Sequence, residues 1–418
     1  MKILFTLHNF FPERIYGAEN VCIQQMRELL RRGHEVALFY ACNKPVSDAQ
    51  LSENGLKGLR LFRVKFLNTR AQVLLSAWKP HITRQFAKAV DQFAPDSIIF
   101  HHLVRLSLDL PFVGWRRKIP TILYLHDFYL ICPMYSLLRA NGDICADTNV
   151  SVCARCLYEN GIQHGMISGH SFRLLSGLRF AAIPFLMLRN QLRLGLGKRV
   201  DVFISPSEFL IREMKRRGAV VGRSRVIPNG GGTASPPEKL VSGSSVRFGY
   251  LGNIIRKKGI EVLVRAFRGR LGEHLTIRGF TDIPDIRAFQ ARFPDFRANL
   301  EIFSSYKESF YKKIDVLLVP SIWYENQPGV IIEAFNNGKT VICSDLGGMS
   351  EMVRHNAWGL VCTPGDPEDL RSKAIHLLKH PSEAERLASS LPRWPSISEN
   401  VSALLETVDT ICSDRACR

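Results

Sequence analysis

Short apolar runs rich in β-branched and aromatic residues alternate with amphipathic stretches along most of the chain. They occupy residues 2–7, 34–40, 97–100, 121–125 and 200–205 in the first half, and 246–252, 275–279, 315–320, 340–344 and 359–362 in the second. Runs of this length and spacing predict β-strands separated by helices, as in βαβ units. The sequence therefore predicts an α/β fold built on parallel sheets.

A segment rich in Gly, Ser and Pro, residues 229–245, interrupts this alternation and is predicted to be a linker. Because 418 residues exceed the size of one ordinary core, we expect two α/β domains, at 1–228 and 246–392. The last section, 393–418, is predicted to form a helix that crosses back to the first domain. Ligands of such sheets bind beyond the carboxyl ends of the strands, so the cleft between the domains is the expected site.

The formal net charge of +18 favours an anionic partner such as nucleic acid, an anionic membrane or a phosphorylated substrate. The basic residues are dispersed and no nucleic-acid-reading module is recognisable, which disfavours a nucleic-acid-binding protein. No apolar run approaches the ~20 residues that span a bilayer. The first run is broken by His8 and Asn9, which predicts a buried strand rather than a secretory leader, and hence a cytoplasmic protein.

The stretch WYENQPGVIIEAF places two acids around a Pro-Gly pair, directly after the run at 315–320. Glu325 then lies in the loop that follows a strand, and Pro328 suits the first position of a helix. Gly329 lets a ligand approach the backbone, and Glu333 lies more than one turn into the helix. The amides expected to be free for an anion belong to Gly329, Val330 and Ile331. This helix N-terminus is therefore a predicted phosphate site.

Two acids beside a phosphate site are poorly suited to bind the phosphate itself. Carboxylates accept hydrogen bonds, so the hydroxyl groups of a ribose and of a sugar, on either side of a diphosphate, are natural partners for Glu325 and Glu333. The alternative is that Glu333 decorates the outside of a helix and Glu325 is a solvated loop acid.

The E-x7-E spacing, together with YLGNIIRKKG (250–259) and SDLGGMSEMV (344–353), resembles the retaining nucleotide-sugar glycosyltransferases of family 4. In the first half the resemblance includes 8–20, 31–36 and 125–133. It implies the GT-B fold, in which two Rossmann-like domains have parallel sheets facing a central cleft. The resemblance further implies that the N-terminal domain binds the acceptor and the C-terminal domain binds the nucleotide sugar.

Roles for individual residues follow from the same resemblance. Glu325 would hold hydroxyls of the donor sugar, Glu333 the ribose hydroxyls, and Lys258 would neutralise the departing diphosphate. His126 matches the family's histidine near the reacting sugar, and the alternative is that His126 and Asp127 are a strand-end pair satisfied by local hydrogen bonds. Helix dipoles, amides and a lysine aimed at the phosphates stabilise the transition state without a metal ion or other cofactor.

Two positions depart from the family pattern. The residue after the glycine of the first motif is usually arginine and is Asn253 here, so Arg256 or Lys257 would replace the missing charge. Gly17 would let the loop after the first strand approach the diphosphate, although the glycine that usually precedes it is Tyr16.

These observations predict a retaining, metal-independent transferase that moves a sugar from a nucleotide-sugar donor to a glycan or lipid-linked acceptor, in polysaccharide or glycolipid biosynthesis. A sugar-nucleotide epimerase or a phosphorylase on the same fold is the enzymatic alternative. The nucleoside, the sugar and the acceptor are left open, because no motif marks the acceptor half of the cleft.

Four cysteines cluster between residues 132 and 156: Cys132, Cys145, Cys153 and Cys156. Four thiols in one loop region are able to form a tetrahedral structural zinc site, although only one C-x2-C pair is present. The alternative is that reduced or transiently paired cysteines order the same loop.

The segment from 160 to 200 contains no acidic residue. Its basic residues include Arg173, Arg179, Arg189, Arg193, Lys198 and Arg199, interleaved with apolar ones. This pattern predicts peripheral contact with an anionic membrane, at the inner face of the cytoplasmic membrane. The alternative is that the apolar residues are core and the arginines a solvated face.

Overall fold

The computed structural model describes residues 1–13, 15, 17–65, 77–163, 182–231, 245–280, 293, 296–302 and 308–416. The chain forms two compact units, one of Met1–Asn229 with Ile397–Arg418 and one of Gly230–Ser396. Most of the predicted linker lies outside the described residues, as do Tyr16, Arg173 and Arg179. None of the described helices is both long enough and apolar enough to cross a membrane.

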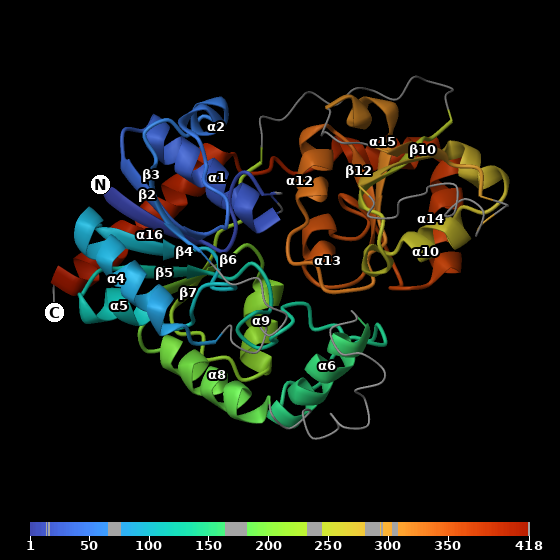
Figure 1. Ribbon diagram of the computed structural model, residues 1–418. Helices are drawn as coiled ribbons and strands as arrows, with labels where there is room; N and C mark the ends of the chain where they lie inside the picture. Colours follow the sequence, from blue (N-terminus) through green and yellow to red (C-terminus); the bar gives the residue numbers. More distant parts are fainter. Residues whose placement is uncertain are drawn as a thin grey trace. The chain divides into compact units, whose positions relative to one another are not determined.

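The first unit is built on a parallel sheet with the strand order β3-β2-β1-β4-β5-β6-β7 (Figure 1). Its strands are β1 (Lys2–Leu7), β2 (Glu35–Ala41), β3 (Arg60–Val64), β4 (Ser97–Phe100), β5 (Thr121–Tyr124), β6 (Val202–Ser205) and β7 (Ser224–Val226). Its described helices are α1 (Gly17–Arg31), α2 (Asp48–Glu53), α4 (Pro80–Phe93), α5 (Leu110–Arg116), α6 (Val150–Gln163), α8 (Ile183–Leu196), α9 (Glu208–Arg216) and α16 (Ile397–Ala416). All five strands predicted in this half are confirmed. The two edge strands, β3 and β7, lack a continuous apolar run and were not predicted.

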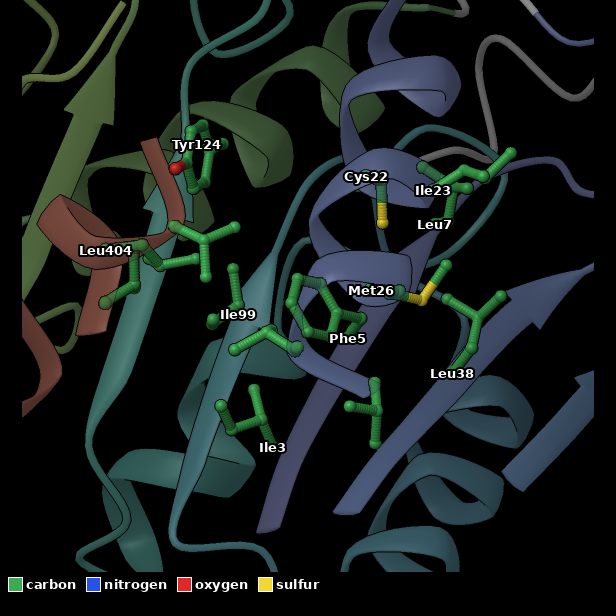
Figure 2. Close-up of a cluster of buried hydrophobic side chains, with 14 of the residues drawn as sticks. Ile3, Phe5, Leu7, Cys22, Ile23, Met26, Leu38, Ile99, Tyr124 and Leu404 are labelled. Carbon is green, nitrogen blue, oxygen red and sulfur yellow. The ribbon is translucent and has the colours of Figure 1, made fainter. Parts of the chain in front are cut away.

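Helices cover both faces of this sheet. On one face Met26 of α1 packs with Phe5 of β1, and Leu404 of α16 joins the same cluster (Figure 2). On the other face Phe86 of α4 meets Phe39 of β2, with ring centroids 5.0 Å apart. Because its apolar side chains are buried in this cluster, α16 belongs to the core of the first unit despite its place at the end of the sequence.

The second unit has a parallel sheet with the order β10-β9-β8-β11-β12-β13. Its strands are β8 (Phe248–Asn253), β9 (Leu275–Phe280), β10 (Asn299–Ile302), β11 (Val316–Val319), β12 (Thr340–Ser344) and β13 (Gly359–Cys362). Its described helices are η2 (Arg256–Lys258), α10 (Ile260–Ala266), η3 (Arg270–His274), η4 (Glu308–Lys313), α12 (Gly329–Asn336), α13 (Gly348–Val353), α14 (Pro367–Lys379) and α15 (Pro381–Ser389). Helices α10 and α14 pack on one face and α12 and α13 on the other. The five strands predicted here are confirmed, and only β10 was missed.

The boundary at the end of the second unit differs from the predicted one. Residues 393–396 belong to this unit, and the final helix begins only at Ile397. Trp394 lies against Phe335, with ring centroids 6.1 Å apart, and Gly231 N donates to Pro395 O at 2.8 Å. These contacts attach the segment to the second unit before the chain returns to the first.

The predicted basic face is wrong for part of α8. Arg189 is buried, and its guanidinium donates to the carbonyl oxygens of Tyr129 and Leu130. The side chains that α8 exposes are instead mostly apolar, among them Phe185 and Met187. Arg189 therefore binds the loop after β5 and is not presented to solvent.

Candidate functional site

The loop that follows β11 is fastened to the turn η2. Ile322 N donates to Lys257 O at 3.0 Å. Gly259, which ends η2, has a φ of +76°, and a Cβ atom there would lie 1.7 Å from the carbonyl oxygen of Pro320. Only glycine fits this close approach. The glycine of the Lys-Gly pair therefore allows the lysines of η2 to lie against the end of β11.

Glu325 is buried in this loop, with 8% of its surface exposed. Its Oε1 accepts three hydrogen bonds, from Lys258 Nζ at 2.6 Å, Trp323 Nε1 at 2.8 Å and Ser321 Oγ at 2.9 Å. Burial raises the pKa of Glu325, but the charge and hydrogen bond of Lys258, with the other two donors, outweigh it and hold the pKa below its ordinary value. Glu325 is thus a buried, ionised carboxylate and not the solvated loop acid of the alternative.

The turn before α13 positions the backbone of Glu325. Gly348 N donates to Glu325 O at 2.8 Å. Gly347 has a φ of +69°, and a Cβ atom there would lie 2.5 Å from the same oxygen. The paired glycines of SDLGGMSEMV, which follow the neighbouring strand β12, therefore hold the backbone of Glu325 in place. This contact links SDLGGMSEMV to the stretch WYENQPGVIIEAF that contains Glu325.

Helix α12 begins one residue later than predicted. Pro328 is its N-cap, with an extended ψ of 122°, and Gly329 is its first residue. Ile331 N donates to Pro328 O at 3.0 Å, so this amide is not available to an anion as predicted. Gly329 is exposed and a Cβ atom there would meet nothing within 4 Å, which leaves room for a ligand beside Val330 and the first turn.

Glu333 lies on the fifth residue of α12 and is half-buried. Its Oε2 accepts a hydrogen bond from Tyr311 OH at 2.8 Å. Burial raises the pKa of Glu333 to about 8. The acid therefore faces inward rather than decorating the helix, and it is largely protonated at neutral pH in the free protein.

Three other residues of the second unit were predicted to bind the donor, and they lie close together in the sequence: Asn253, Arg256 and Lys257. Asn253 ends β8, and its carbonyl oxygen accepts from Tyr250 OH at 2.7 Å. Arg256 is exposed on η2, and Lys257 Nζ lies 4.2 Å from the ring centroid of Trp323. Burial and the neighbouring Lys258 lower the pKa of Lys257. Two basic residues of η2, Lys257 and Lys258, thus lie near the Glu325 carboxylate.

In the first unit, histidines follow three neighbouring strands: His8 after β1, His101 and His102 after β4, and His126 after β5. Val104 N donates to His102 Nδ1 at 3.0 Å, so the proton of His102 is on Nε2, which donates to Asp127 Oδ2 at 2.8 Å. His126 bonds to His101 instead. His126 and Asp127 are therefore bound to different histidines and do not form a pair with each other.

A chain of hydrogen bonds runs from α16 to His126. Asn400 Nδ2 donates to Pro228 O at 2.6 Å, which leaves Asn400 Oδ1 to accept from Gln25 Nε2 at 2.8 Å. Gln25 Oε1 then accepts from His101 Nε2 at 2.9 Å, and His101 Nδ1 accepts from His126 Nε2 at 2.9 Å. Because a carbonyl oxygen only accepts, Pro228 fixes the direction of every bond and places the proton of His126 on Nε2. Burial lowers the pKa of His126 to about 3, so the ring is neutral.

Gly17 is the first residue of α1, is exposed, and has open space where a Cβ atom would stand. In the first turn of the same helix Glu19 is buried and accepts from His8 Nε2 at 3.1 Å. Within the described residues the Nδ1 atom of His8 is buried and has no hydrogen-bond partner. This strand end therefore combines open backbone with a buried polar atom that still lacks a partner.

Two parallel-sheet α/β units, each with candidate site residues beyond the carboxyl ends of its strands, define a GT-B glycosyltransferase fold. The family comparison agrees: residues 15–231 match the model described as Glycosyltransferase Family 4, which is more than half of the chain. Residues 245–380 match the model described as Glycosyl transferases group 1. The chain belongs to glycosyltransferase family 4.

Full-length relatives are distant. The chain is 21% identical over 367 residues to an uncharacterized 42.6 kDa protein in the cps region of Klebsiella pneumoniae, covering 85% of this chain and 88% of the relative. It is 23% identical over 410 residues to glycogen synthase of Mycobacterium tuberculosis, covering 93% and 88%. Among solved structures, Anabaena Alr3699/HepE in complex with UDP-glucose superposes with a TM-score of 0.64 at 16% identity, covering 97% of this chain and all of that one. This last likeness supports the fold.

Proposed function

We propose that this chain is a retaining, metal-independent glycosyltransferase that moves a sugar from a nucleotide sugar to a glycan or lipid-linked acceptor. The observation that carries the proposal is the pair formed by Lys258 and the buried carboxylate of Glu325. This pair lies at a strand end that precedes the exposed first residue of α12, Gly329. A related solved chain holds UDP-glucose, which supports a nucleotide-sugar donor here.

The pair provides both charges that the reaction needs. As the nucleoside diphosphate leaves, negative charge grows on the phosphate oxygens and positive charge on the anomeric carbon. Lys258, with Lys257 nearby and the first turn of α12, provides positive charge for the phosphates. Glu325, already ionised, provides negative charge for the sugar. The residues of the chain therefore supply the electrostatic stabilisation that a bound metal ion supplies in other transferases.

His126 is proposed to contact the reacting sugar as a neutral hydrogen-bonding group. With a pKa of about 3 it does not titrate near neutral pH, so it is not the general acid that an isolated histidine is well suited to be. The hydrogen bond to His101 fixes both its tautomer and the orientation of its ring.

A pH dependence follows from Glu333. Ribose hydroxyls donate to a carboxylate, whereas the free protein holds Glu333 protonated below a pKa of about 8. Donor binding must then release a proton, so the donor KM should fall as pH rises from 6 to 8 and level off above it. Glu333→Gln should remove this slope. Initial rates across donor concentration at each pH measure both curves, and a donor KM with the same pH slope in both proteins would exclude the ribose role.

The free energy of unfolding gives a second way to detect the raised pKa of Glu333. The pKa of Glu333 is raised from its ordinary 4.5 to about 8, so between these values the folded state holds a proton that the unfolded state has released. The free energy of unfolding should therefore decrease as pH rises through this window. In Glu333→Gln this contribution is absent, and urea unfolding at pH 5, 7 and 9 compares the two proteins.

Peripheral attachment to the inner face of the cytoplasmic membrane is proposed through α8. Its exposed apolar side chains include Phe185, Met187 and Leu188, and the net charge of +18 attracts anionic lipid. The triple variant with serine at these positions should bind anionic vesicles about tenfold more weakly in a sedimentation assay. Neutral phosphatidylcholine vesicles are the control, and equal binding of both proteins to anionic vesicles would contradict attachment by α8.

The proposed activity is tested directly with a panel of nucleotide sugars. A donor that binds should first be identified by thermal stabilisation, since ligand at a hundred times its Kd stabilises by about 2.7 kcal/mol. Release of nucleoside diphosphate should then require an acceptor and be independent of added Mg²⁺, and NMR of the product should show the anomeric configuration of the donor. An inverted anomer or a Mg²⁺ requirement would contradict the mechanism. A free epimer or a phosphate-dependent sugar phosphate would instead identify an epimerase or a phosphorylase.

A further inference from the structure

Four cysteines of the first unit line one small cavity. They are Cys132, Cys145, Cys153 and Cys156, here called the thiol cluster, and all are free thiols. The cavity measures about 10 Å³, close to the volume of one water-sized sphere. Most other residues around it are apolar, among them Met134 and Leu157. Four thiols therefore border a space suited to a single small ion. The other residues that line the cavity carry no charged side chain that would compete with the thiols for that ion.

The first two members of the thiol cluster flank a hairpin. The arms of the hairpin pair at one antiparallel bridge, between Leu138 and Ile144; Cys132 precedes this hairpin and Cys145 follows it directly. The backbone N–H groups of Met134 and Leu137 donate to the sulfur of Cys132. The chain around the hairpin thus holds the sulfur of Cys132 at the cavity through two backbone donors.

Helix α6 supplies the other two members. Cys153 and Cys156 are three residues apart near its start and so lie on one face. The helix thus presents a C-x2-C pair to the same cavity that Cys132 and Cys145 line.

Two arginines lie beside the thiol cluster. The side chain of Arg139 hydrogen-bonds to Cys145. The buried Arg189 of α8 lies close enough to Cys132 and Cys153 to interact with both electrostatically. A divalent cation held by four thiolates has a net charge of about −2. These two guanidinium groups are placed to offset that charge.

We propose that the thiol cluster binds one zinc ion as a closed, structural site. Four S–H bonds break, four Zn–S bonds form, and four protons leave to solvent, with no oxidation or reduction. In the part of the chain that the structure describes, no three His, Cys, Asp or Glu side chains are already placed to hold an ion. The thiol of Cys145 donates instead to Asp147 O at 2.7 Å. Binding of zinc would therefore replace this hydrogen bond with a bond from the sulfur to the ion.

The zinc would brace the segment that carries His126. Phe128 N donates to Tyr135 O at 3.2 Å and Cys132 N to Phe128 O at 2.8 Å, so the chain from Asp127 to the first ligand is short and already folded back on itself. A bond from Cys132 through the ion to α6 ties this segment to a helix. The proposal does not depend on the proposed function, because metal content is measured on the protein alone.

Elemental analysis of the full chain, purified without chelator, tests the site. We expect about one zinc per chain. When a mercurial reagent is added stepwise, the zinc should be released in proportion to the reagent until four thiols have reacted. A coloured chelator measures the released zinc. Zinc sulfate added to chelator-stripped protein should raise its Tm. Less than about a tenth of an equivalent of zinc, iron with inorganic sulfide, or disulfides among the four cysteines by mass spectrometry would each overturn the proposal.

Variants separate this site from the other cysteines. Cys153→Ser with Cys156→Ser should lower the zinc content at least tenfold, whereas Cys412→Ser, in α16 and outside the thiol cluster, should retain it. If the double variant does not fold, the mercurial titration of the parent protein still decides the question. Equal zinc content in the double variant and the parent would overturn the assignment of ligands.

Discussion

Replacing Lys258 with alanine is expected to lower kcat at least a hundredfold, about 3 kcal/mol of barrier, because one positive charge aimed at the departing diphosphate is lost. The fold should weaken too, since Lys258 Nζ lies 2.6 Å from the buried Oε1 of Glu325. Removing one partner of such a hydrogen bond costs on the order of 1–3 kcal/mol. Initial rates and urea unfolding measure the two effects.

A matched control variant and a double variant show whether the loss of kcat and of stability in Lys258→Ala is specific to this lysine and to its pairing with Glu325. Lys312→Ala removes an exposed lysine of the same unit and should change neither quantity by more than the experimental error. In a Glu325→Gln background, Lys258→Ala should no longer reduce stability, because an amide needs no counter-charge. A Lys258→Ala protein with kcat within threefold of the parent would remove this lysine from the mechanism.

Glu325→Gln should also lower kcat about a hundredfold, while the donor KM stays the same or falls. The positive charge on the sugar exists only in the transition state, so a carboxylate beside it contributes to turnover and little to ground-state binding. The substitution also frees Lys258 from its ion pair, which favours the diphosphate. Steady-state kinetics over a range of donor concentration separate kcat from KM.

Glu333→Gln is the matched comparison, since it removes a carboxyl group from the same unit and keeps its shape. It should raise the donor KM and spare kcat, most clearly above pH 8, where the parent residue is ionised. The same kinetic signature in both variants, or a loss of kcat in Glu333→Gln alone, would show that the roles are assigned wrongly.

Much of the fold was predictable because buried parallel strands are continuous apolar runs. The strands that were missed, β3, β7 and β10, lie at sheet edges, where fewer contacts demand apolar residues. The position of Glu325 after a strand was predictable in the same way. Its pairing with Lys258 was not, because the two are 67 residues apart and no local pattern links them.

The histidine network was only partly predictable. His101 and His102 follow β4 directly, so a search for polar residues at the ends of neighbouring strands would have found them. Gln25 lies within the apolar stripe of α1, and Asn400 is 375 residues further along the chain. Neither has a local sequence signal, because each acts only through partners that the tertiary fold brings to it.

The return of the chain through α16 bears on how such enzymes are recombined. Asn400 of this helix begins the hydrogen-bonded chain that sets the tautomer of His126, although a cut in the 229–245 segment would assign the helix to the other half. A hybrid made by exchanging halves at that cut would combine a foreign helix with Gln25 and Pro228. The residues that form the histidine network are therefore discontinuous in the sequence. A hybrid that keeps the network must take residues 397–416 from the same parent as residues 1–229.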